Sequence, residues 1–182
     1  MERKLEILES SIGEGEVFRF FLRQAYLFAQ NSNDPSTQVG SVIVHPKSGI
    51  ISGASNSTPN GLIVPEEMLK DATQKEMMME HAERNAIYRC AASSVSSVGC
   101  HLYTTLPPCV ECARGIIQSG IVQVVSHSQM LDAYGESSVR TKRLEQGLHM
   151  LLQAGIRCIL WKGKVFSTPL TTIRVRGKSW NP

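Results

Sequence analysis

Four residues in two short motifs have the types and the spacing of a catalytic metal site. His81 and Glu83 are separated by one residue, and Cys109 and Cys112 follow in a Pro-Cys-x-x-Cys motif. One imidazole and two thiolates give a zinc ion (Zn2+) three protein ligands, which leaves the fourth tetrahedral position for water. A carboxylate two residues from the histidine can carry protons to and from that water. The motifs therefore predict zinc-dependent hydrolytic chemistry, with Glu83 as the catalytic proton carrier.

Two other interpretations of these motifs stay open at this point. A Cys-x-x-Cys pair in an α/β protein can be a redox pair, which would form a Cys109–Cys112 disulfide without a metal. A closed structural zinc site would need a fourth ligand, and no other Cys or His stands at paired spacing near either motif. The combination and order of the two motifs favour a catalytic metal over both.

Both motifs stand where helices are predicted to begin. Residues 81–92 carry apolar side chains at helical period, and residues 109–119 form a second predicted helix that Gly120 ends. Cysteines three apart in a first turn lie on one face, so both sulfurs can reach one ion. Two positive helix ends would then converge on the ion and favour deprotonated thiolates.

The rest of the chain is predicted to alternate strands and helices around these motifs. Helices are predicted at residues 17–30 and 138–154, and residues 66–75 form a short helix or an insertion. Strands are predicted at residues 37–45, 50–53, 100–106, 121–125 and 156–161. Because strands joined through helices favour parallel pairing, the predicted fold is a three-layer α/β/α sandwich with a five-stranded mixed sheet.

Composition indicates one domain over residues 1–182, with 42% hydrophobic residues to fill its core. The formal net charge of +3 is spread along the chain, so a nucleic-acid partner is not indicated. No apolar run has the length of a signal peptide or a membrane span, and a cytoplasmic location is expected. Cys90, Cys100 and Cys158 are interpreted as small core residues. The basic tail at residues 162–182 has no predicted position.

The sequence resembles the deoxycytidylate deaminase family, within the cytidine deaminase-like fold. The similarity covers most of residues 17–160 and is densest at residues 34–44, 81–87, 102–113 and 116–121. These segments include Asp-Pro-Ser-Thr-Gln-Val-Gly, His-Ala-Glu-Arg-Asn-Ala-Ile and Thr-Leu-Pro-Pro-Cys-Val-Glu-Cys-Ala. Asn85 favours this family over tRNA adenosine deaminases and guanine deaminases, which share the zinc motifs.

The resemblance implies a hydrolytic deaminase that converts deoxycytidine monophosphate (dCMP) to the uracil nucleotide and ammonia. Its zinc ligands would be His81, Cys109 and Cys112, and Glu83 would move protons from water to the cytosine ring. Asn56 aligns with the asparagine of a family loop that binds the sugar, although an asparagine there can also be a turn residue. The family commonly forms hexamers, so a homo-oligomer is expected.

Departures from the family pattern leave the substrate open. Residues 31–33 read Asn-Ser-Asn where the family often has arginine and lysine, which removes cations that could bind a phosphate. An unphosphorylated nucleoside, another base, or a non-catalytic zinc-stabilised binding module therefore remain alternatives. Residues 62–64 also lack the family's polar residues there, so regulation by deoxycytidine triphosphate with magnesium is not predicted. His127 and Tyr134 are weaker pocket candidates, interpreted as loop residues.

Overall fold

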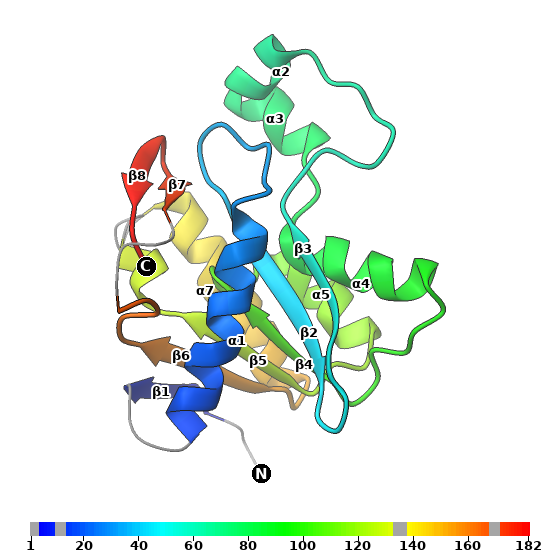
Figure 1. The fold of residues 1–182 in the computed structure, drawn as a ribbon, viewed down its shortest axis with the longest axis vertical. Coiled ribbons are helices and arrows are strands. Elements are labelled where there is room, and N and C mark those ends of the chain that lie inside the picture. Colours follow the sequence, from blue (N-terminus) through cyan, green and yellow to red (C-terminus); the bar gives the residue numbers. More distant parts are fainter. Residues whose placement is uncertain (1–3, 10–13, 133–137, 168–171) are drawn as a thin grey trace.

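A six-stranded mixed sheet forms the centre of the protein in a computed structural model, which describes residues 4–9, 14–132, 138–167 and 172–182 (Figure 1). The strand order is β1-β6-β5-β4-β2-β3. The strands are β1 (Glu6–Glu9), β2 (Gly40–His45), β3 (Gly49–Ser55), β4 (His101–Thr104), β5 (Gln123–His127) and β6 (Arg157–Lys162). Strands β1, β6, β5 and β4 are parallel, whereas β2 is antiparallel to β3 and β4.

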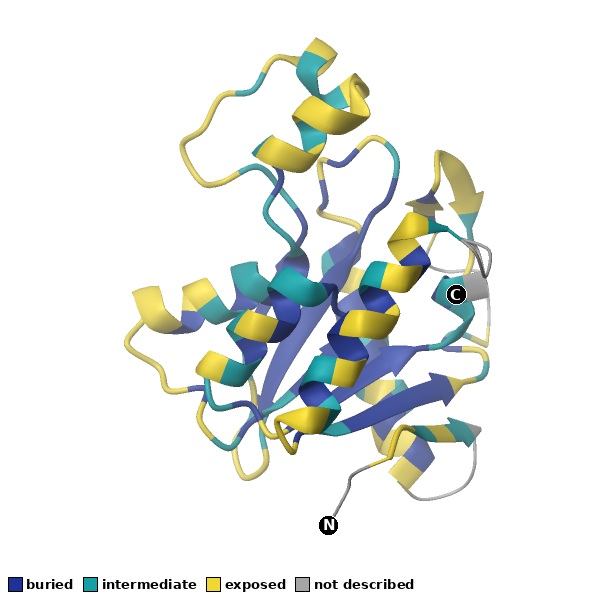
Figure 2. Cartoon of the chain, turned by 180° about the vertical axis from the view of Figure 1, so that it is seen from behind, coloured by how far each residue is buried: buried dark blue, intermediate teal, exposed yellow. Residues whose placement is uncertain are grey.

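Helices cover both faces of this sheet, which confirms the predicted three-layer α/β/α fold. Helix α1 packs on one face, and α4, α5 and α7 lie on the other (Figures 1 and 2). No helix in the described ranges is long and apolar enough to cross a membrane. The helices are α1 (Glu14–Ala29), α2 (Glu66–Lys70), α3 (Ala72–Met78), α4 (Ala82–Ala92), α5 (Val110–Gln118), α6 (Gln129–Asp132) and α7 (Val139–Gln153).

The predicted number of five strands was wrong, because the sheet has a sixth. The additional strand is β1, an edge strand that pairs with β6. Its alternation of charged and aliphatic residues gives a weak local signal, and its Ile7 side chain is 65% exposed. Pairing with a distant strand, and not burial, defines this element.

The core is built from the apolar stripes that the sequence pattern indicated. On α1, Phe18, Leu22 and Tyr26 are buried between the helix and the sheet. Leu102 and Ile116 belong to a second cluster that fills the space under α4, α5 and α7. Figure 2 shows the strands buried and the outer helix faces exposed. The sheet is therefore shielded from water on both sides.

The C-terminal segment, which had no predicted position, forms a small hairpin of β7 (Ile173–Val175) and β8 (Lys178–Trp180). Backbone hydrogen bonds dock it on the loop before β2: the Gln38 amide donates to the Arg174 carbonyl at 2.8 Å, and the Gly177 amide donates to the Ser36 carbonyl at 2.7 Å. This docking could not be predicted locally because its partners lie about 140 residues earlier in the chain.

One edge of the sheet collects the loops that carry the polar motifs. Parallel strand β4 ends at Thr104, and antiparallel β2 begins beside it, since Ser41 pairs with Thr104. Strand β3 ends at the same edge, because Ser55 pairs with Gly40. Ligands of open α/β sheets bind outside the carboxyl ends of the parallel strands. This edge is therefore where a functional site is expected.

A close contact between α7 and the start of α5 yields a stability prediction. A Cβ atom added at Gly147 would lie 2.8 Å from the carbonyl carbon of Cys109 and would overlap the Pro108 carbonyl oxygen. We expect Gly147→Ala to lower the free energy of unfolding by about 1 to 3 kcal/mol through overpacking. Urea unfolding measures the change.

Gly115→Ala is the matched control, because an added Cβ there makes an ordinary contact of 3.5 Å with Arg84. Removing a glycine from a helix interior should then stabilise the protein by up to about 1 kcal/mol. Equal stability of the two variants would contradict the close packing of α7 on Cys109.

Candidate active site

Three side chains converge at the edge of the sheet described above. The Nδ1 atom of His81 lies 3.4 Å from Sγ of Cys109 and 3.3 Å from Sγ of Cys112. All three ligand atoms lie within 4.8 Å of one another, and no fourth His, Cys, Asp or Glu joins the group in the described part of the chain. The structure thus brings together the three predicted metal-binding residues.

This arrangement fits zinc in both donor type and spacing. Tetrahedral zinc, with nitrogen at about 2.0 Å and sulfur at about 2.3 Å, requires ligand atoms roughly 3.5 to 3.8 Å apart. The observed separations of 3.3 and 3.4 Å are close to these values. Three protein ligands also match the pattern of catalytic zinc, which keeps one position for water or substrate.

The ligands are placed by the starts of two helices. His81 is the N-cap residue of α4 and Cys109 is the N-cap residue of α5, and neither side chain makes a capping hydrogen bond. Their side chains point instead toward each other. The positive ends of both helices therefore converge on the same point and favour negative charge there, as the sequence indicated.

The carboxyl group of Glu83 is buried in the first turn of α4, with the residue only 3% exposed. Burial is the largest influence and raises the pKa of Glu83, while the charge of His81 opposes that rise. A carboxyl with a raised pKa is suited to exchanging protons near neutral pH. Glu83 also lines the pocket described below, so it can reach a bound molecule.

The two thiols differ in acidity. A hydrogen bond with Cys112 is the largest influence that lowers the pKa of Cys109 to about 4, against the effect of burial. The same bond, together with burial, raises the pKa of Cys112. Burial would lower the pKa of His81, but the hydrogen bond to Cys109 and the charge of Glu83 outweigh it and the pKa is raised. When zinc binds, both thiols must be deprotonated and the imidazole neutral.

A second layer of charge supports the ligands. The Nη1 atom of Arg84 lies 3.8 Å from the Cys112 sulfur, and its Nε donates to Oε1 of Glu80 at 2.6 Å. The same Glu80 oxygen accepts from the His81 amide at 3.0 Å. Arg84 therefore offsets the negative charge of a Cys112 thiolate, and Glu80 holds the Arg84 guanidinium in position. The sequence analysis assigned no role to either residue.

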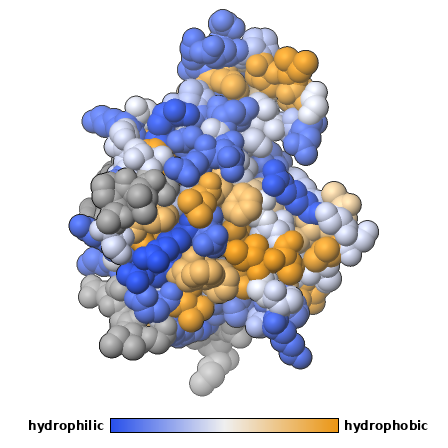
Figure 3. Space-filling model, in the orientation of Figure 1, coloured by the Kyte–Doolittle hydropathy of each residue, from blue (hydrophilic) through white to orange (hydrophobic). Residues whose placement is uncertain are grey.

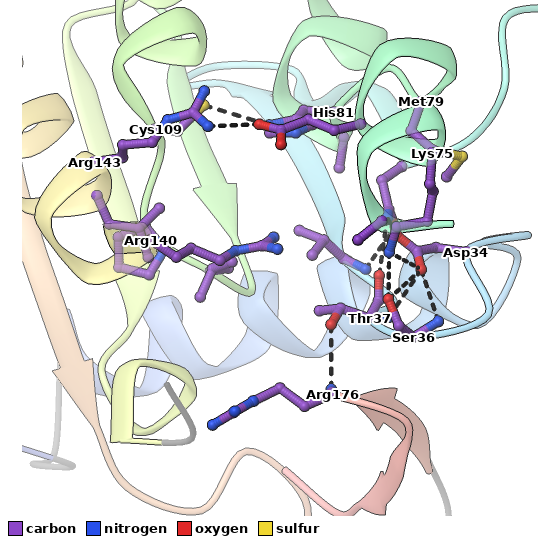
Figure 4. A pocket seen from close by; sticks show the side chains of 18 of the residues that line it. Asp34, Ser36, Thr37, Lys75, Met79, His81, Cys109, Arg140, Arg143 and Arg176 are labelled. Carbon is purple, nitrogen blue, oxygen red and sulfur yellow. Dashed lines mark hydrogen bonds and ion pairs between the residues drawn. The ribbon is translucent and has the colours of Figure 1, made fainter. Parts of the chain in front are cut away.

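A cavity of about 610 Å³ opens from this group, large enough for a small-molecule ligand. His81 and Cys109 lie at one end of its wall (Figure 4), and Glu83 also lines it. The loop before β2, the segments that follow β3 and β4, helix α3, the start of α7 and the β7–β8 turn contribute to the remaining walls. Elements from both ends of the chain therefore enclose one site.

Asn56, predicted to bind the sugar, lines this cavity but is also a structural residue. Its Oδ1 accepts from the Val39 amide at 2.8 Å, and its Nδ2 donates to Oδ2 of Asp34 at 3.2 Å and to the Thr37 carbonyl at 2.9 Å. Both amide hydrogens are thus used within the protein. Its remaining capacity toward a ligand is one lone pair on Oδ1.

Asp34 holds the neighbouring loop and a lysine from α3. Its carboxylate accepts from the Ser36 and Thr37 amides at 2.7 and 3.0 Å, and from Nζ of Lys75 at 2.9 Å. Burial raises the pKa of Asp34, but the hydrogen bonds from Lys75, Ser36 and Thr37 lower it by more. Asp34 therefore stays ionised and ties the insertion at α3 to the pocket wall.

Three arginines reach the cavity from segments to which sequence analysis gave no role. Arg143 on α7 makes ion pairs with Glu76 at 2.5 Å and Glu111 at 3.0 Å, which link α3 to α5. Arg140 lies at the start of the same helix, and Arg176 lies in the turn between β7 and β8. The proximity of Arg176 to the other two arginines could not be predicted because it depends on the docking of the C-terminal hairpin.

His127, a weaker pocket candidate, is a buried strand residue outside the cavity wall. Its Nε2 donates to the Gly163 carbonyl at 2.9 Å, so its Nδ1 accepts from the Tyr26 hydroxyl at 2.6 Å. The prediction of a loop residue was wrong, because β5 extends to His127. Tyr134 lies outside the described residues.

Comparisons with known proteins agree with this geometry. Residues 16–128 match the model of the cytidine and deoxycytidylate deaminase zinc-binding region. The chain is 37% identical to deoxycytidylate deaminase of Mus musculus over 129 residues, covering 67% of this chain and 68% of that protein. It is 30% identical to ComE operon protein 2 of Bacillus subtilis over 136 residues, covering 70% of each.

A solved structure is similar in fold as well as in sequence. The dCMP deaminase of cyanophage S-TIM5, in complex with dCMP and dUMP, aligns with a TM-score of 0.61 and 26% identity. The alignment covers 82% of this chain and 98% of that chain. Fold and site together define a zinc-dependent deaminase.

The chain belongs to the cytidine and deoxycytidylate deaminase family. Zinc is the metal of the matched region, which decides against the interpretation of Cys109 and Cys112 as a redox pair. The resemblance inferred from the motifs is thereby confirmed.

Removal of a ligand tests the metal site. We expect purified protein to contain about one zinc per chain and Cys112→Ser or His81→Ala to lose most of it, since each ligand contributes directly to binding. Elemental analysis gives the metal content. Cys90→Ala is the control, because Cys90 is buried in α4 within the other core cluster. Full zinc retention in both ligand variants would contradict the assignment.

Proposed function

We propose that the protein is a zinc-dependent hydrolytic deaminase that converts dCMP to the uracil nucleotide and ammonia. The observation that carries this proposal is the buried Glu83 carboxyl in the same pocket wall as His81 and Cys109, two members of the three-residue metal-binding group. The relatives that are deoxycytidylate deaminases, and the solved structure with dCMP and dUMP, support the choice of a cytosine nucleotide.

The residues of the site divide the work of the reaction. His81, Cys109 and Cys112 would hold zinc, which when bound supplies positive charge to acidify a water molecule and to stabilise charge that develops at C4. Glu83 takes a proton from the attacking water and delivers it to N3 of the cytosine ring. It then helps to protonate the exocyclic amine, so that one water is consumed for each ammonia released.

Asn56 would orient the sugar. Its Oδ1 already accepts from the Val39 amide, and the second lone pair of that oxygen can accept from a sugar hydroxyl. Because Asp34 and Thr37 hold the amide nitrogen, the oxygen is fixed in direction. The substrate would then lie between the sheet edge and α3, with its base toward Glu83.

The alternatives have less support. A non-catalytic binding module gives no reason to bury a carboxyl group with a raised pKa in the pocket wall. An unphosphorylated substrate was motivated by Asn31, Ser32 and Asn33, but none of these residues lines the cavity. The missing cations at these positions therefore do not argue against a nucleotide.

Glu83→Gln tests catalysis apart from binding. Glutamine keeps the shape of the side chain but cannot exchange protons, so we expect kcat for dCMP to fall about 10²- to 10⁴-fold. Zinc content should stay near one per chain. Glu145→Gln, on the exposed face of α7, serves as the control. Unchanged turnover in Glu83→Gln with zinc bound would contradict the mechanism.

The protein is further inferred to form a homo-oligomer, as the hexamers common in the family imply. In support, apolar side chains gather on the surface over α1 and the β2–β3 hairpin (Figure 3), where Val17, Phe20, Leu27 and Ile50 are at least 40% exposed. We expect Phe20→Glu to shift the assembly toward monomers in analytical ultracentrifugation. Wild-type protein that sediments as a monomer at micromolar concentration would contradict this inference.

A cytoplasmic location is part of the same proposal. None of the five cysteines forms a disulfide, which suits a reducing compartment. Cell fractionation that recovers the protein in another compartment would contradict it.

A further inference from the structure

We propose that Arg140 and Arg176 recognise the 5′-phosphate of the substrate and so set the preference of the enzyme for a nucleoside monophosphate over a nucleoside. This inference rests on the proposed deaminase function. Both residues lie outside residues 16–128, which the family model matches. The cavity thus has cations at positions other than residues 31–33, where the family often has them.

The position of the two arginines in the cavity suits one end of a nucleotide. Both line the pocket that contains His81 and Glu83. Figure 4 shows the Arg140 side chain extending into the cavity and Arg176 lying across it from His81 and Cys109. With its base at the metal end, a substrate would direct its far end toward these guanidinium groups. Planar guanidinium groups bind phosphate through paired hydrogen bonds.

Helix α7 adds a second favourable element beside Arg140. Its N-cap residue, Ser138, lines the same cavity and accepts from the Thr141 amide at 3.0 Å. The positive end of this 15-residue helix therefore faces the pocket. Phosphate groups are stabilised at such helix starts, so the dipole and the Arg140 charge act on the same ligand.

Arg176 is held in place by an unusual turn. Its φ of 52° and the φ of 75° at Gly177 form a left-handed turn between β7 and β8. A non-glycine residue in this region is uncommon, and asparagine or glycine would fit the turn better. The Arg176 amide donates to Oγ1 of Thr37 at 3.2 Å, which ties the turn to the pocket wall. The hairpin thus presents an arginine where a smaller residue would be preferred.

Aromatic packing fixes the rest of the hairpin. The Trp180 ring lies 5.8 Å from both Tyr26 and His127, measured between ring centroids. The Arg174 amide donates to Oε1 of Gln38 at 2.9 Å. These contacts hold the turn firmly enough for Arg176 to act as a preorganised ligand-binding residue.

Lys75 and Arg143 also line the cavity, and their contacts hold elements of its wall in place. Lys75 bonds with Asp34 and Ser36, and Arg143 pairs with Glu76 and Glu111. They hold α3 and α7 around the cavity. We assign phosphate recognition to the arginines at the start of α7 and in the hairpin turn because of where their side chains lie in the cavity, across from the metal end (Figure 4).

The test compares substrates that differ only in the phosphate. The kcat/KM for dCMP and for deoxycytidine is measured on zinc-loaded wild type, Arg140→Gln and Arg176→Gln. We expect each substitution to lower the value for dCMP about 10- to 100-fold, because it removes charge-assisted hydrogen bonds to the phosphate. The value for deoxycytidine should change less than about threefold, since that substrate lacks the group these arginines bind. Calorimetry with dUMP and deoxyuridine gives the same comparison without turnover.

Matched controls lie on the same two elements. Lys142→Gln on α7 and Arg174→Gln on β7 remove exposed cations that do not line the cavity, so dCMP turnover should stay at the wild-type level. Zinc content and circular dichroism establish that each variant is folded.

The outcomes separate this inference from the proposed function. Equal losses for dCMP and deoxycytidine, or no loss for either, in the arginine variants would overturn the phosphate site while leaving the deaminase proposal intact. A wild-type enzyme that deaminates neither compound would overturn the deaminase proposal itself. Preferred deamination of cytosine in a single-stranded oligonucleotide, with weak turnover of dCMP, would show that the arginines bind a nucleic-acid backbone and would overturn the inference.

Discussion

The structure depends on the convergence of two helix starts at one edge of the sheet. His81 and Cys109 are the N-cap residues of α4 and α5, and Cys112 lies in the first turn of α5. Because the three ligand atoms come from two separate helices, their separations of 3.3 and 3.4 Å exist only if the sheet and both helices pack correctly. Helix α7 packs closely against the backbone of Cys109 at Gly147 and so helps to hold the start of α5 in place.

Burial of one carboxyl group turns a metal-binding edge into a candidate catalytic site. Glu83 follows His81 by two residues on the first turn of α4, so the geometry that places the proposed ligand also places the proposed proton carrier. Burial raises the pKa of Glu83. Asp34 lines the same cavity but stays ionised, because it accepts several hydrogen bonds. Two carboxyl groups in one pocket thus have different roles because their surroundings differ.

The parts of this account that sequence could predict are those encoded by nearby residues. The spacing of His81, Glu83, Cys109 and Cys112 indicated the zinc centre, and apolar periodicity indicated most helices and the layered fold. The parts it missed need distant partners. Strand β1 exists through pairing with β6, and Arg176 reaches the cavity only because the hairpin docks on Gln38 and Ser36. No local pattern carries that information.

X-ray absorption at the zinc edge tests whether three protein ligands hold a zinc ion and leave one position open. Such a site has two sulfurs at about 2.3 Å, with one imidazole nitrogen and one further light atom at about 2.0 Å. Addition of a substrate analogue should alter the shell of that light atom and leave the sulfurs unchanged. A spectrum with three or four sulfurs, or with a second imidazole, would contradict the account.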